Sequence, residues 1–471
     1  MEERTVATID LGSSKIALTI AKINNDDVKV IYYKETPSDG INESAVYNPM
    51  RASVAISKAI SEAENELKIK ILQVIAGLPR YEVRQEKTSA QMERTDPESC
   101  ITQEEIDFLK SKALNEYPLE DEKDKVYGAV AQSFSTDELV RMPESDIVGS
   151  VSGILEGNFK VFIGKKTGAS NLEKVFQQLG LAISTAMFVP DATADAVLSE
   201  EEKDNGVALI DMGAGVTSVT IFQGGILRHY GAIPFGSGNI TSDIRYECSF
   251  SKDLAENIKL GYGACLPDKL QSMSEKILKI TNEEDGTSKD LQVRYLSQII
   301  NARQKEIFEA MLYEIEISGY ADRLRSGVVI TGGGAALTNS ANLLREMSGY
   351  DIRIGFPRMK HFTAGDCPDI METSATASVG MLMRARRDKW LNCIEDPATT
   401  AARLAEEKRK EEAEKEPDYT NTVFEENGGN EKPENPEPKK KKPRQPKVTF
   451  FKRAAEKGLG LLGSLYENID G

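Results

Sequence analysis

Two glycine-rich loops about 200 residues apart follow one plan and constrain the fold of this chain more than any other feature. The first reads Ile-Asp-Leu-Gly-Ser-Ser-Lys over residues 9–15, and the second reads Ile-Asp-Met-Gly-Ala-Gly-Val-Thr over residues 210–217. In each, an apolar strand ends in an aspartate, glycines and hydroxyl residues follow, and strand character returns. Glycine lets the backbone N–H groups of such a hairpin turn approach an anion closely. Two hairpins that face one another therefore predict a two-lobed clamp for a polyphosphate.

A third glycine element supports this interpretation. The apolar strand at 328–331 runs into Gly332, Gly333 and Gly334, and helical spacing follows from Leu337 to Met347. A strand-to-helix turn of this kind lets a ligand lie on the backbone and on the helix N-terminus. Asp-x-Gly turns are also ordinary hairpin connections, so either loop alone is open to a purely structural interpretation. Three elements in this order favour the clamp.

Composition excludes several classes of protein. A chain of 471 residues is expected to form two or more domains, and its net charge of −16 argues against general nucleic-acid binding. Only His229 and His361 are available, which excludes a multi-histidine metal site. The N-terminus runs straight into a strand without a signal peptide, and no apolar run approaches the roughly 20 residues that span a bilayer. Five scattered cysteines without a Cys-x-x-Cys pair indicate a reduced, cytosolic chain: Cys100, Cys248, Cys265, Cys367 and Cys393.

Two stretches read as insertions into the strand-rich body. The polar stretch at 85–160 predicts a small α+β unit, with a helix that starts at a capping box formed by Thr102 and Glu105. The stretch at 226–307 is mostly helical. His229, on a strand away from both loops, is expected to be structural.

The end of the chain predicts a tethered helix. Residues 396–446 are too polar and too rich in proline to offset their ordering entropy, and as a disordered coil they span on the order of 40 Å. At 447–469 apolar residues recur in steps of three and four, with basic residues beside and upstream of them. This pattern favours an amphipathic helix on an anionic lipid surface, and the alternative is a helix that docks on protein. The membrane contacts are expected from Phe450, Phe451, Lys452, Arg453, Leu459, Leu462, Leu465 and Tyr466.

These motifs resemble those of the FtsA family, the actin-like bacterial proteins that tether FtsZ filaments to the cytoplasmic membrane. The resemblance runs through most of residues 5–395. Segments 6–15 and 206–213 look like the two phosphate loops of the family, and 255–263 looks like the helix that approaches adenosine. Segments 101–106 and 148–156 are similar to the small subdomain peculiar to FtsA among actin relatives. The tail is similar in kind and position to the membrane-targeting helix.

The resemblance implies an α/β fold: an actin-like, two-lobed ATP-binding fold with an inserted α+β subdomain, a disordered linker and a C-terminal amphipathic helix. Its parts are expected as follows: a first lobe (1A) at 1–84 and 161–197, the inserted subdomain (1C) at 85–160, a second lobe (2A) at 198–236 and 304–395, subdomain 2B at 237–303, the linker at 396–446 and the helix at 447–469.

ATP and Mg²⁺ are the expected ligands of the clamp. Asp10 and Asp211 are the candidates to hold Mg²⁺ through water, since a hard cation prefers oxygen ligands, unless either carboxylate merely caps its turn. Phosphate contacts are expected from Gly12, Ser13, Ser14, Lys15, Gly213, Gly215 and Thr217. By resemblance, Gly332, Gly333 and Gly334 flank the adenosine, and Glu256 and Lys259 reach its polar edge.

The implied function is an ATP-binding protein that polymerises at the inner face of the cytoplasmic membrane. There, as a peripheral protein at the division site, it tethers FtsZ filaments and recruits later division proteins through the 85–160 subdomain. Its partners are copies of itself, anionic lipids and the C-terminal peptide of FtsZ, which Arg294 and Arg303 would meet. No nucleic acid is expected among them.

The chain departs from the family pattern at two places. Val216 and Ser218 stand where the family has a hydroxyl and a carboxylate, so ATP is expected to act mainly as a structural switch, with no catalytic residue assigned and at most weak ATPase activity. Leu-Pro-Arg at 78–80 replaces a segment that often holds Gly-x-His. The alternatives are an active ATPase or kinase of the same superfamily, and an actin-like adaptor of a pilus or secretion machine.

Overall fold

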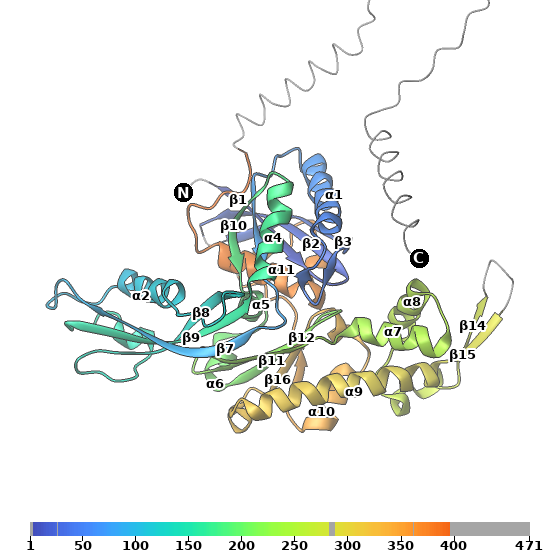
Figure 1. Ribbon diagram of the computed structural model, residues 1–471. Coiled ribbons are helices and arrows are strands. Elements are labelled where there is room, and N and C mark those ends of the chain that lie inside the picture. The colour runs from blue at the N-terminus through green and yellow to red at the C-terminus, as the bar shows by residue number, and fades with distance from the viewer. Residues whose placement is uncertain (1–2, 26, 282–287, 361, 396–471) are drawn as a thin grey trace, which may run out of the picture. The chain divides into compact units, whose positions relative to one another are not determined.

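The structure is a computed structural model and describes residues 3–25, 27–281, 288–360 and 362–395 (Figure 1). Its two main sheets repeat one arrangement. The six-stranded sheet has the order β10–β6–β1–β2–β3–β18, and the five-stranded sheet has the order β13–β12–β11–β16–β17. In each, a central hairpin carries a third antiparallel strand on one side and a parallel strand on the other, as in β6–β1–β2–β3 and β16–β11–β12–β13.

The strands of the first sheet are β1 (Arg4–Leu11), β2 (Lys15–Asn24), β3 (Asp27–Pro37), β6 (Gln73–Gly77), β10 (Ala182–Met187) and β18 (Phe362–Thr363). Those of the second sheet are β11 (Val207–Met212), β12 (Thr217–Gln223), β13 (Ile226–Ile233), β16 (Val328–Thr331) and β17 (Ile352–Ile354). The central strands of both sheets are buried along nearly their whole length and carry apolar residues on both faces.

Two buried helices join the sheets. Helix α11 (Thr376–Ala385) packs against β1, helix α5 (Val189–Val197) packs against β12, and the two helices pack on each other. Their close approach depends on Gly380, where a Cβ atom would lie 2.1 Å from the carbonyl oxygen of Ala192. One apolar core therefore runs from the first sheet through these helices to the facing side of the second sheet.

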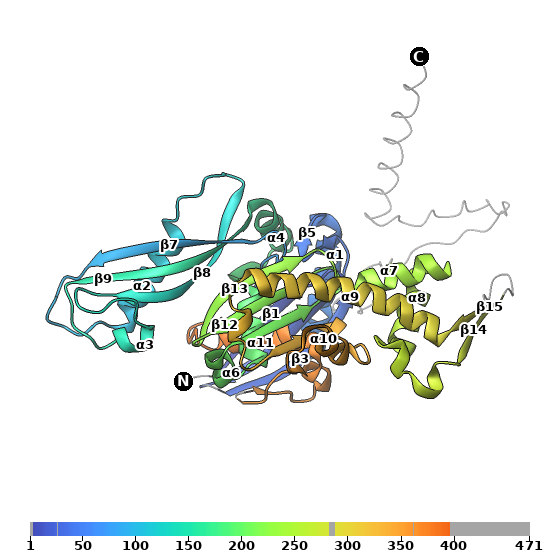
Figure 2. The ribbon, with the colours of Figure 1, turned by 90° about the horizontal axis from the view of Figure 1, so that it is seen from below.

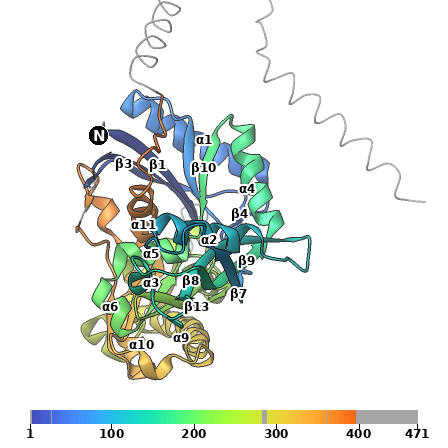
Figure 3. The same cartoon turned by 90° about the vertical axis from the view of Figure 1, so that its left-hand side faces the viewer.

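Other helices cover the outer faces (Figures 2 and 3). Helices α1 (Pro49–Leu67) and α4 (Lys166–Gln178) pack together over the first sheet, while α9 (Val293–Ile317) and α10 (Ser340–Ser348) pack on the second. The start of α1 is fixed by Asn48, whose side chain accepts from the backbone N–H of Arg51 at 3.2 Å, and by Pro49 in the first turn. A short helix, α6 (Glu200–Asn205), precedes β11.

A separate three-stranded sheet is built from β7 (Arg84–Glu93), β8 (Asp124–Ser135) and β9 (Ile154–Lys165), in the order β7–β9–β8. Helices α2 (Gln103–Asn115) and α3 (Glu144–Ile147) complete it, and it has an apolar core of its own that includes Leu109, Phe134 and Phe159. The predicted capping box at the start of α2 is confirmed, since Thr102 and Glu105 each bond the other's backbone N–H.

The segment between β13 and α9 is mostly helical. Helices α7 (Ser237–Cys248) and α8 (Lys252–Tyr262) are followed by a hairpin of β14 (Ile277–Thr281) and β15 (Ser288–Gln292) (Figure 1). A smaller hairpin, β4 (Ile41–Asn42) and β5 (Ala45–Val46), precedes α1.

The assignment of 304–395 to the second lobe needs correction in its last part. Strand β18 pairs with β3 of the first sheet, α11 packs against β1, and the N–H of Cys393 donates to the carbonyl of Thr5 at 2.7 Å. The chain thus returns to the first sheet after β17. The sequence did not predict this return, because β18 has only two residues, too few for a periodic pattern. The other predicted boundaries stay predictions.

The linker at 396–446 and the amphipathic helix at 447–469 lie outside the described residues. Within the described ranges, no helix combines the length and the hydrophobicity that crossing a membrane requires.

Candidate functional site

The two glycine loops close with the same hydrogen bond. The N–H of Gly12 donates to the carbonyl of Lys15 at 2.9 Å, and the N–H of Gly213 donates to the carbonyl of Val216 at 2.9 Å. The register also matches, with Asp10 opposite Ala17 in one hairpin and Asp211 opposite Ser218 in the other. The two loops are therefore structural equivalents, one from each sheet.

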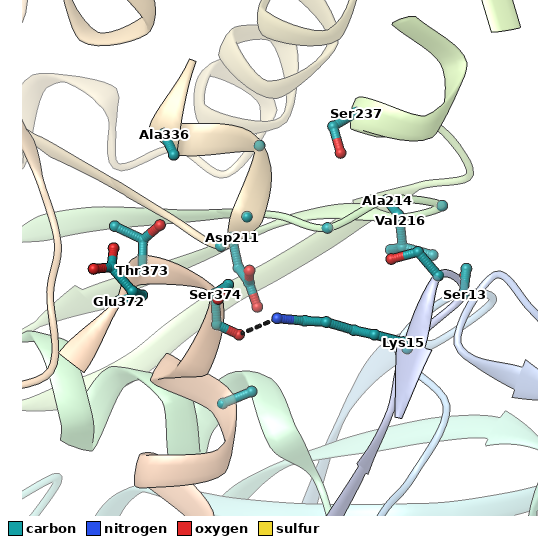
Figure 4. Close-up of a pocket in the computed structure, with 18 of the residues that line it drawn as sticks. Ser13, Lys15, Asp211, Ala214, Val216, Ser237, Ala336, Glu372, Thr373 and Ser374 are labelled. Carbon is teal, nitrogen blue, oxygen red and sulfur yellow. Dashed lines mark hydrogen bonds between the residues drawn. The ribbon is translucent and has the colours of Figure 1, made fainter. Parts of the chain in front are cut away.

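Both loops line one cavity of about 460 Å³, a size common for small-molecule sites, and lie side by side there (Figure 4). They are in contact at its edge, because a Cβ atom on Gly215 would lie 2.5 Å from the hydroxyl of Ser13. The cavity brings together nearly all the residues predicted to bind the nucleotide: Asp10, Gly12, Ser13, Ser14, Lys15, Asp211, Gly213, Gly215, Glu256, Lys259, Gly332, Gly333 and Gly334.

Thr217 is the exception, and its predicted phosphate contact is corrected. Its side chain is fully buried, its hydroxyl donates to the carbonyl of Phe235 at 2.8 Å, and it does not line the cavity. In the matched register Thr217 corresponds to Ile16, which is also fully buried. The strand has already begun at this position, so the side chain points into the core.

The glycine triplet lies directly against the second loop. Gly332 has a φ of 84°, and a Cβ atom there would lie 2.5 Å from a carboxylate oxygen of Asp211. Only glycine fits such a conformation and such a close approach. The triplet continues as a 3₁₀ turn at Gly333–Ala336, and α10 begins only at Ser340, so the turn rather than the α-helix borders the cavity.

Glu256 and Lys259, one turn apart on α8, form an ion pair that lines the cavity. Their charged atoms lie 2.8 Å apart, and Lys259 also donates to the Thr241 hydroxyl at 2.8 Å and to the Ser237 carbonyl at 3.1 Å. Burial lowers the pKa of Lys259, and Glu256 opposes that shift. Thr241 also donates to Glu256. The network holds a carboxylate and an ammonium in fixed positions beside the cavity.

Lys15 reaches across the cavity toward the segment before α11 (Figure 4). Its ammonium pairs with Glu35 and lies 3.3 Å from the carbonyl oxygen of Ser374. Sequence reasoning missed this facing segment, in which Glu372, Thr373 and Ser374 line the cavity. The only signal was a run of small and hydroxyl residues ahead of an apolar helix.

Sequence reasoning also missed Arg80, although its Leu-Pro-Arg segment stood out as a departure from the family pattern. Its guanidinium lies between the two loop aspartates, donating to Asp10 and, at 3.2 Å, to Asp211. Burial disfavours the charge on Arg80, but the two carboxylates outweigh burial and raise its pKa. Burial raises the pKa of Asp211, while Arg80 opposes and Asp10 reinforces that shift.

This arrangement does not fit the Mg²⁺ predicted between Asp10 and Asp211. The side chains of Arg80, Asp10 and Asp211 are only 12%, 14% and 10% exposed, and a cation already bridges the two carboxylates. A magnesium ion that keeps its waters needs room for them beside the same oxygens. In the part of the chain that the structure describes, no cluster of three or more His, Cys, Asp or Glu side chains is placed to hold a metal ion.

Three other residues singled out in the sequence lie away from the cavity. The two ring nitrogens of His229 form hydrogen bonds with the side chains of Gln85 and Glu314. His229 therefore joins β13 to β7 and α9, as expected for a structural role. Arg294 pairs with Asp268 at 3.2 Å, and Arg303 is held by Asp243 at 2.6 Å and by Glu306 at 2.7 Å.

Comparison with known proteins gives one consistent result. The model of the family described as "Cell division protein FtsA" matches residues 208–379. The cell division protein FtsA of Neisseria meningitidis serogroup B is 30% identical over 361 residues, which are 76% of this chain and 85% of that protein. The FtsA of Borreliella burgdorferi is 29% identical over 370 residues, 76% of this chain and 86% of the relative.

Among solved structures, a chain of the PilM–PilN type IV pilus biogenesis complex matches with a TM-score of 0.54 and 16% identity, over 80% of this chain and 98% of that one. A likeness at this identity concerns the fold alone. The expected actin-like α/β fold is confirmed, and with the relatives above this chain belongs to the FtsA family of actin-like cell-division proteins.

Proposed function

We propose that this protein binds ATP between its two lobes and uses the nucleotide as a structural switch. The observation that carries the proposal is the pair of equivalent glycine hairpins, one from each sheet, that meet at a single cavity and both line it. Backbone N–H groups in such turns favour a polyphosphate. The glycine triplet and the Glu256–Lys259 pair provide the adenosine end.

ATP in this position touches both sheets and therefore sets the angle between them. The two sheets are joined through α5 and α11, so a change of that angle moves the surfaces of one lobe relative to those of the other. We infer that the ATP-bound angle favours contacts between copies of the chain and hence a homopolymer. Hydrolysis is expected to be slow, because the guanidinium of Arg80 occupies carboxylate oxygens of both Asp10 and Asp211 that a general base would have to turn toward water.

The polymer acts at the inner face of the cytoplasmic membrane at the division site. The amphipathic segment 447–469 lies outside the described residues, and its role rests on the sequence pattern. One copy of a glycine-containing helix binds lipid weakly, so a polymer that presents many tails binds cooperatively. The body recruits the C-terminal peptide of FtsZ through subdomain 2B and later division proteins through the three-stranded subdomain, as FtsA family membership suggests.

Co-sedimentation with vesicles tests the membrane role. Full-length protein with ATP is mixed with vesicles that contain anionic lipid, and it is compared with a chain truncated after Lys447. We expect the full chain to pellet, more so at low salt, and the truncated chain to stay in solution. Leu462→Glu, on the apolar stripe, should behave like the truncation, while Glu456→Gln, on the polar side, should behave like the full chain.

Equal pelleting of the full and truncated chains would contradict the tether and leave a helix that docks on protein. The nucleotide clamp is tested separately by calorimetric titration with ATP. The truncated chain should bind ATP as the full chain does, because the whole cavity lies between residues 10 and 377.

A further inference from the structure

Arg80 is fixed between the two lobes by its backbone as well as by its side chain. It follows β6 of the first sheet, directly after Pro79, and its carbonyl accepts from the hydroxyl of Tyr230 on β13 of the second sheet. Its guanidinium donates to Asp10 of the first sheet and to Asp211 of the second. Side chain and backbone thus both span the gap between the sheets.

Arg80 also lines the cavity itself. Two of its N–H groups are used by Asp10 and Asp211, and no further acceptor for Arg80 occurs among the described residues. A guanidinium carries five N–H donors in a planar fork that matches phosphate oxygens. Donors therefore remain for a polyphosphate that lies between the two glycine loops.

The local charges leave little reason for a second cation between Asp10 and Asp211. Arg80 reduces the charge of the aspartate pair from −2 to −1, and Lys15, the next cation along the cavity, is paired with Glu35. A divalent ion placed between Asp10 and Asp211 would lie against the guanidinium and be repelled by it. The guanidinium already supplies the positive charge that joins the two carboxylates, and its remaining N–H groups are available to phosphate oxygens.

We propose that Arg80 takes the place of the metal ion in this clamp. Its guanidinium is the resident cation that bridges Asp10 and Asp211, and the phosphates of the nucleotide bind against it without Mg²⁺. This inference rests on the proposed nucleotide clamp and adds the cation that the clamp uses.

Calorimetric titration of the full chain with ATP, in excess EDTA and in millimolar MgCl₂, tests the proposal. For the unmodified protein we expect dissociation constants in the two buffers to agree within about threefold. Arg80→Gln removes the charge and keeps much of the side chain. This variant should bind ATP at least tenfold more weakly than the unmodified protein in EDTA, and Mg²⁺ should restore much of the lost affinity. Arg80→Lys keeps a cation and should fall between the two. Arg84→Gln is the matched control, because Arg84 pairs with Glu86 and Asp124 outside the cavity.

A second readout uses no nucleotide. Mg²⁺ should raise the melting temperature of Arg80→Gln, in which the two aspartates face each other without a cation, and should leave the unmodified protein unchanged. ATP binding that requires Mg²⁺ in the unmodified protein would overturn the inference and leave the clamp intact. No ATP binding in either buffer would overturn the clamp and the inference together. Because the unmodified chain decides between these results, the proposal does not depend on whether the variants fold.

Discussion

At the scale of single residues, the site depends on glycine where a side chain would collide with neighbouring atoms. Gly332 has a left-handed φ of 84° and no room for a side chain. A Cβ atom there would lie 2.5 Å from a carboxylate oxygen of Asp211 and 2.6 Å from the carbonyl oxygen of Met212. Gly349, at the end of α10, has a similar φ of 73° but open space around it. The two glycines separate the cost of the backbone conformation from the cost of crowding.

We expect Gly332→Ala to destabilise the protein by about 1–3 kcal/mol more than Gly349→Ala, and to weaken ATP binding as well. Both substitutions incur the free-energy cost of placing alanine in the left-handed conformation, but only Gly332→Ala displaces Asp211. Urea unfolding and ATP titration of the two variants measure the difference. Equal stabilities would show that the crowding at Gly332 is relieved at little cost.

How far the sequence predicted each site residue depended on whether its role is local. The glycines and Asp10 are placed by their own turn, and a turn can be read from a few neighbouring residues. Thr217 was assigned to the wrong side because the exact end of the turn decides which way a strand residue points. Arg80 could not be placed at all, since its partners lie 70 and 131 positions away along the chain.

At the scale of elements, β13 is the edge strand of its sheet, and side chains of the three-stranded sheet cover that edge. The amide of Gln85 exchanges hydrogen bonds with the backbone of Tyr230, Gln132 donates to the carbonyl of Leu227 at 3.0 Å, and Lys160 donates to the carbonyl of Arg228. An uncovered edge would be free to pair with another chain. Burial, with Lys87 and Arg228 nearby, lowers the pKa of Lys160 to about 8.

That lowered pKa predicts a pH-dependent stability. Between pH 8 and the usual lysine pKa near 10.4, the unfolded chain holds the proton of Lys160 and the folded chain has released it. The contribution of Lys160 to the free energy of unfolding therefore rises with pH across that interval and is at its lowest below pH 8. Urea midpoints of the unmodified protein relative to Lys160→Met, measured from pH 7 to 10, should show this rise. Lys125→Met, at a half-exposed site of the same sheet, controls for the change in net charge. A pH-independent difference would contradict the prediction.

The two arginines expected to meet FtsZ do not share a face of α9. They are nine residues apart, which at about 100° per residue places them on opposite sides of the helix. Arg294 is half exposed and pairs with an exposed Asp268, whereas Arg303 is held by Asp243 and Glu306. An acidic peptide competes more easily for Arg294.

We therefore expect Arg294→Glu to weaken binding of a labelled FtsZ C-terminal peptide by about tenfold, since reversing an exposed charge repels an acidic partner. Arg303→Gln should change that affinity little and instead lower the melting temperature, because it breaks the link between α9 and α7. Fluorescence anisotropy and thermal unfolding measure the two effects. The reverse pattern would place the peptide on the Arg303 side.

Elements with their own stop and start signals were predictable, and elements defined by distant pairing were not. The capping box of α2 and the Asn-Pro start of α1 lie within single segments of sequence. Strand β18 has two residues, and its partner β3 lies more than 300 positions earlier. No pattern within 362–395 says to which sheet that segment returns.

At the scale of the whole described body, the apolar cores determine what unfolds together. One core spans the first sheet, α5, α11 and the facing side of the second sheet, and a second core lies under α9 and α10. The three-stranded sheet keeps a third core, built around Leu109, Phe134 and Phe159. The first two share the strands of the second sheet, so their opening is coupled. One end of β8 and β9 also belongs to the first core through Tyr127 and Phe162, while the other end, around the third core, is able to open by itself.

ATP bound between the loops should therefore stabilise both lobes and leave the part of the three-stranded sheet around the third core unaffected. At an ATP concentration 100 times the dissociation constant, the gain is about 2.7 kcal/mol, which is roughly a hundredfold slowing of amides that exchange only when the lobes unfold. Hydrogen exchange with and without ATP should show this slowing in β1 and β11 alike, and no comparable change near Phe134 of β8 and Phe159 of β9, where the third core can open without the cavity coming apart. Slowing confined to one sheet would mean that the nucleotide is held by a single loop. In that case ATP could not set the angle between the lobes, and the switch would have to act within one lobe.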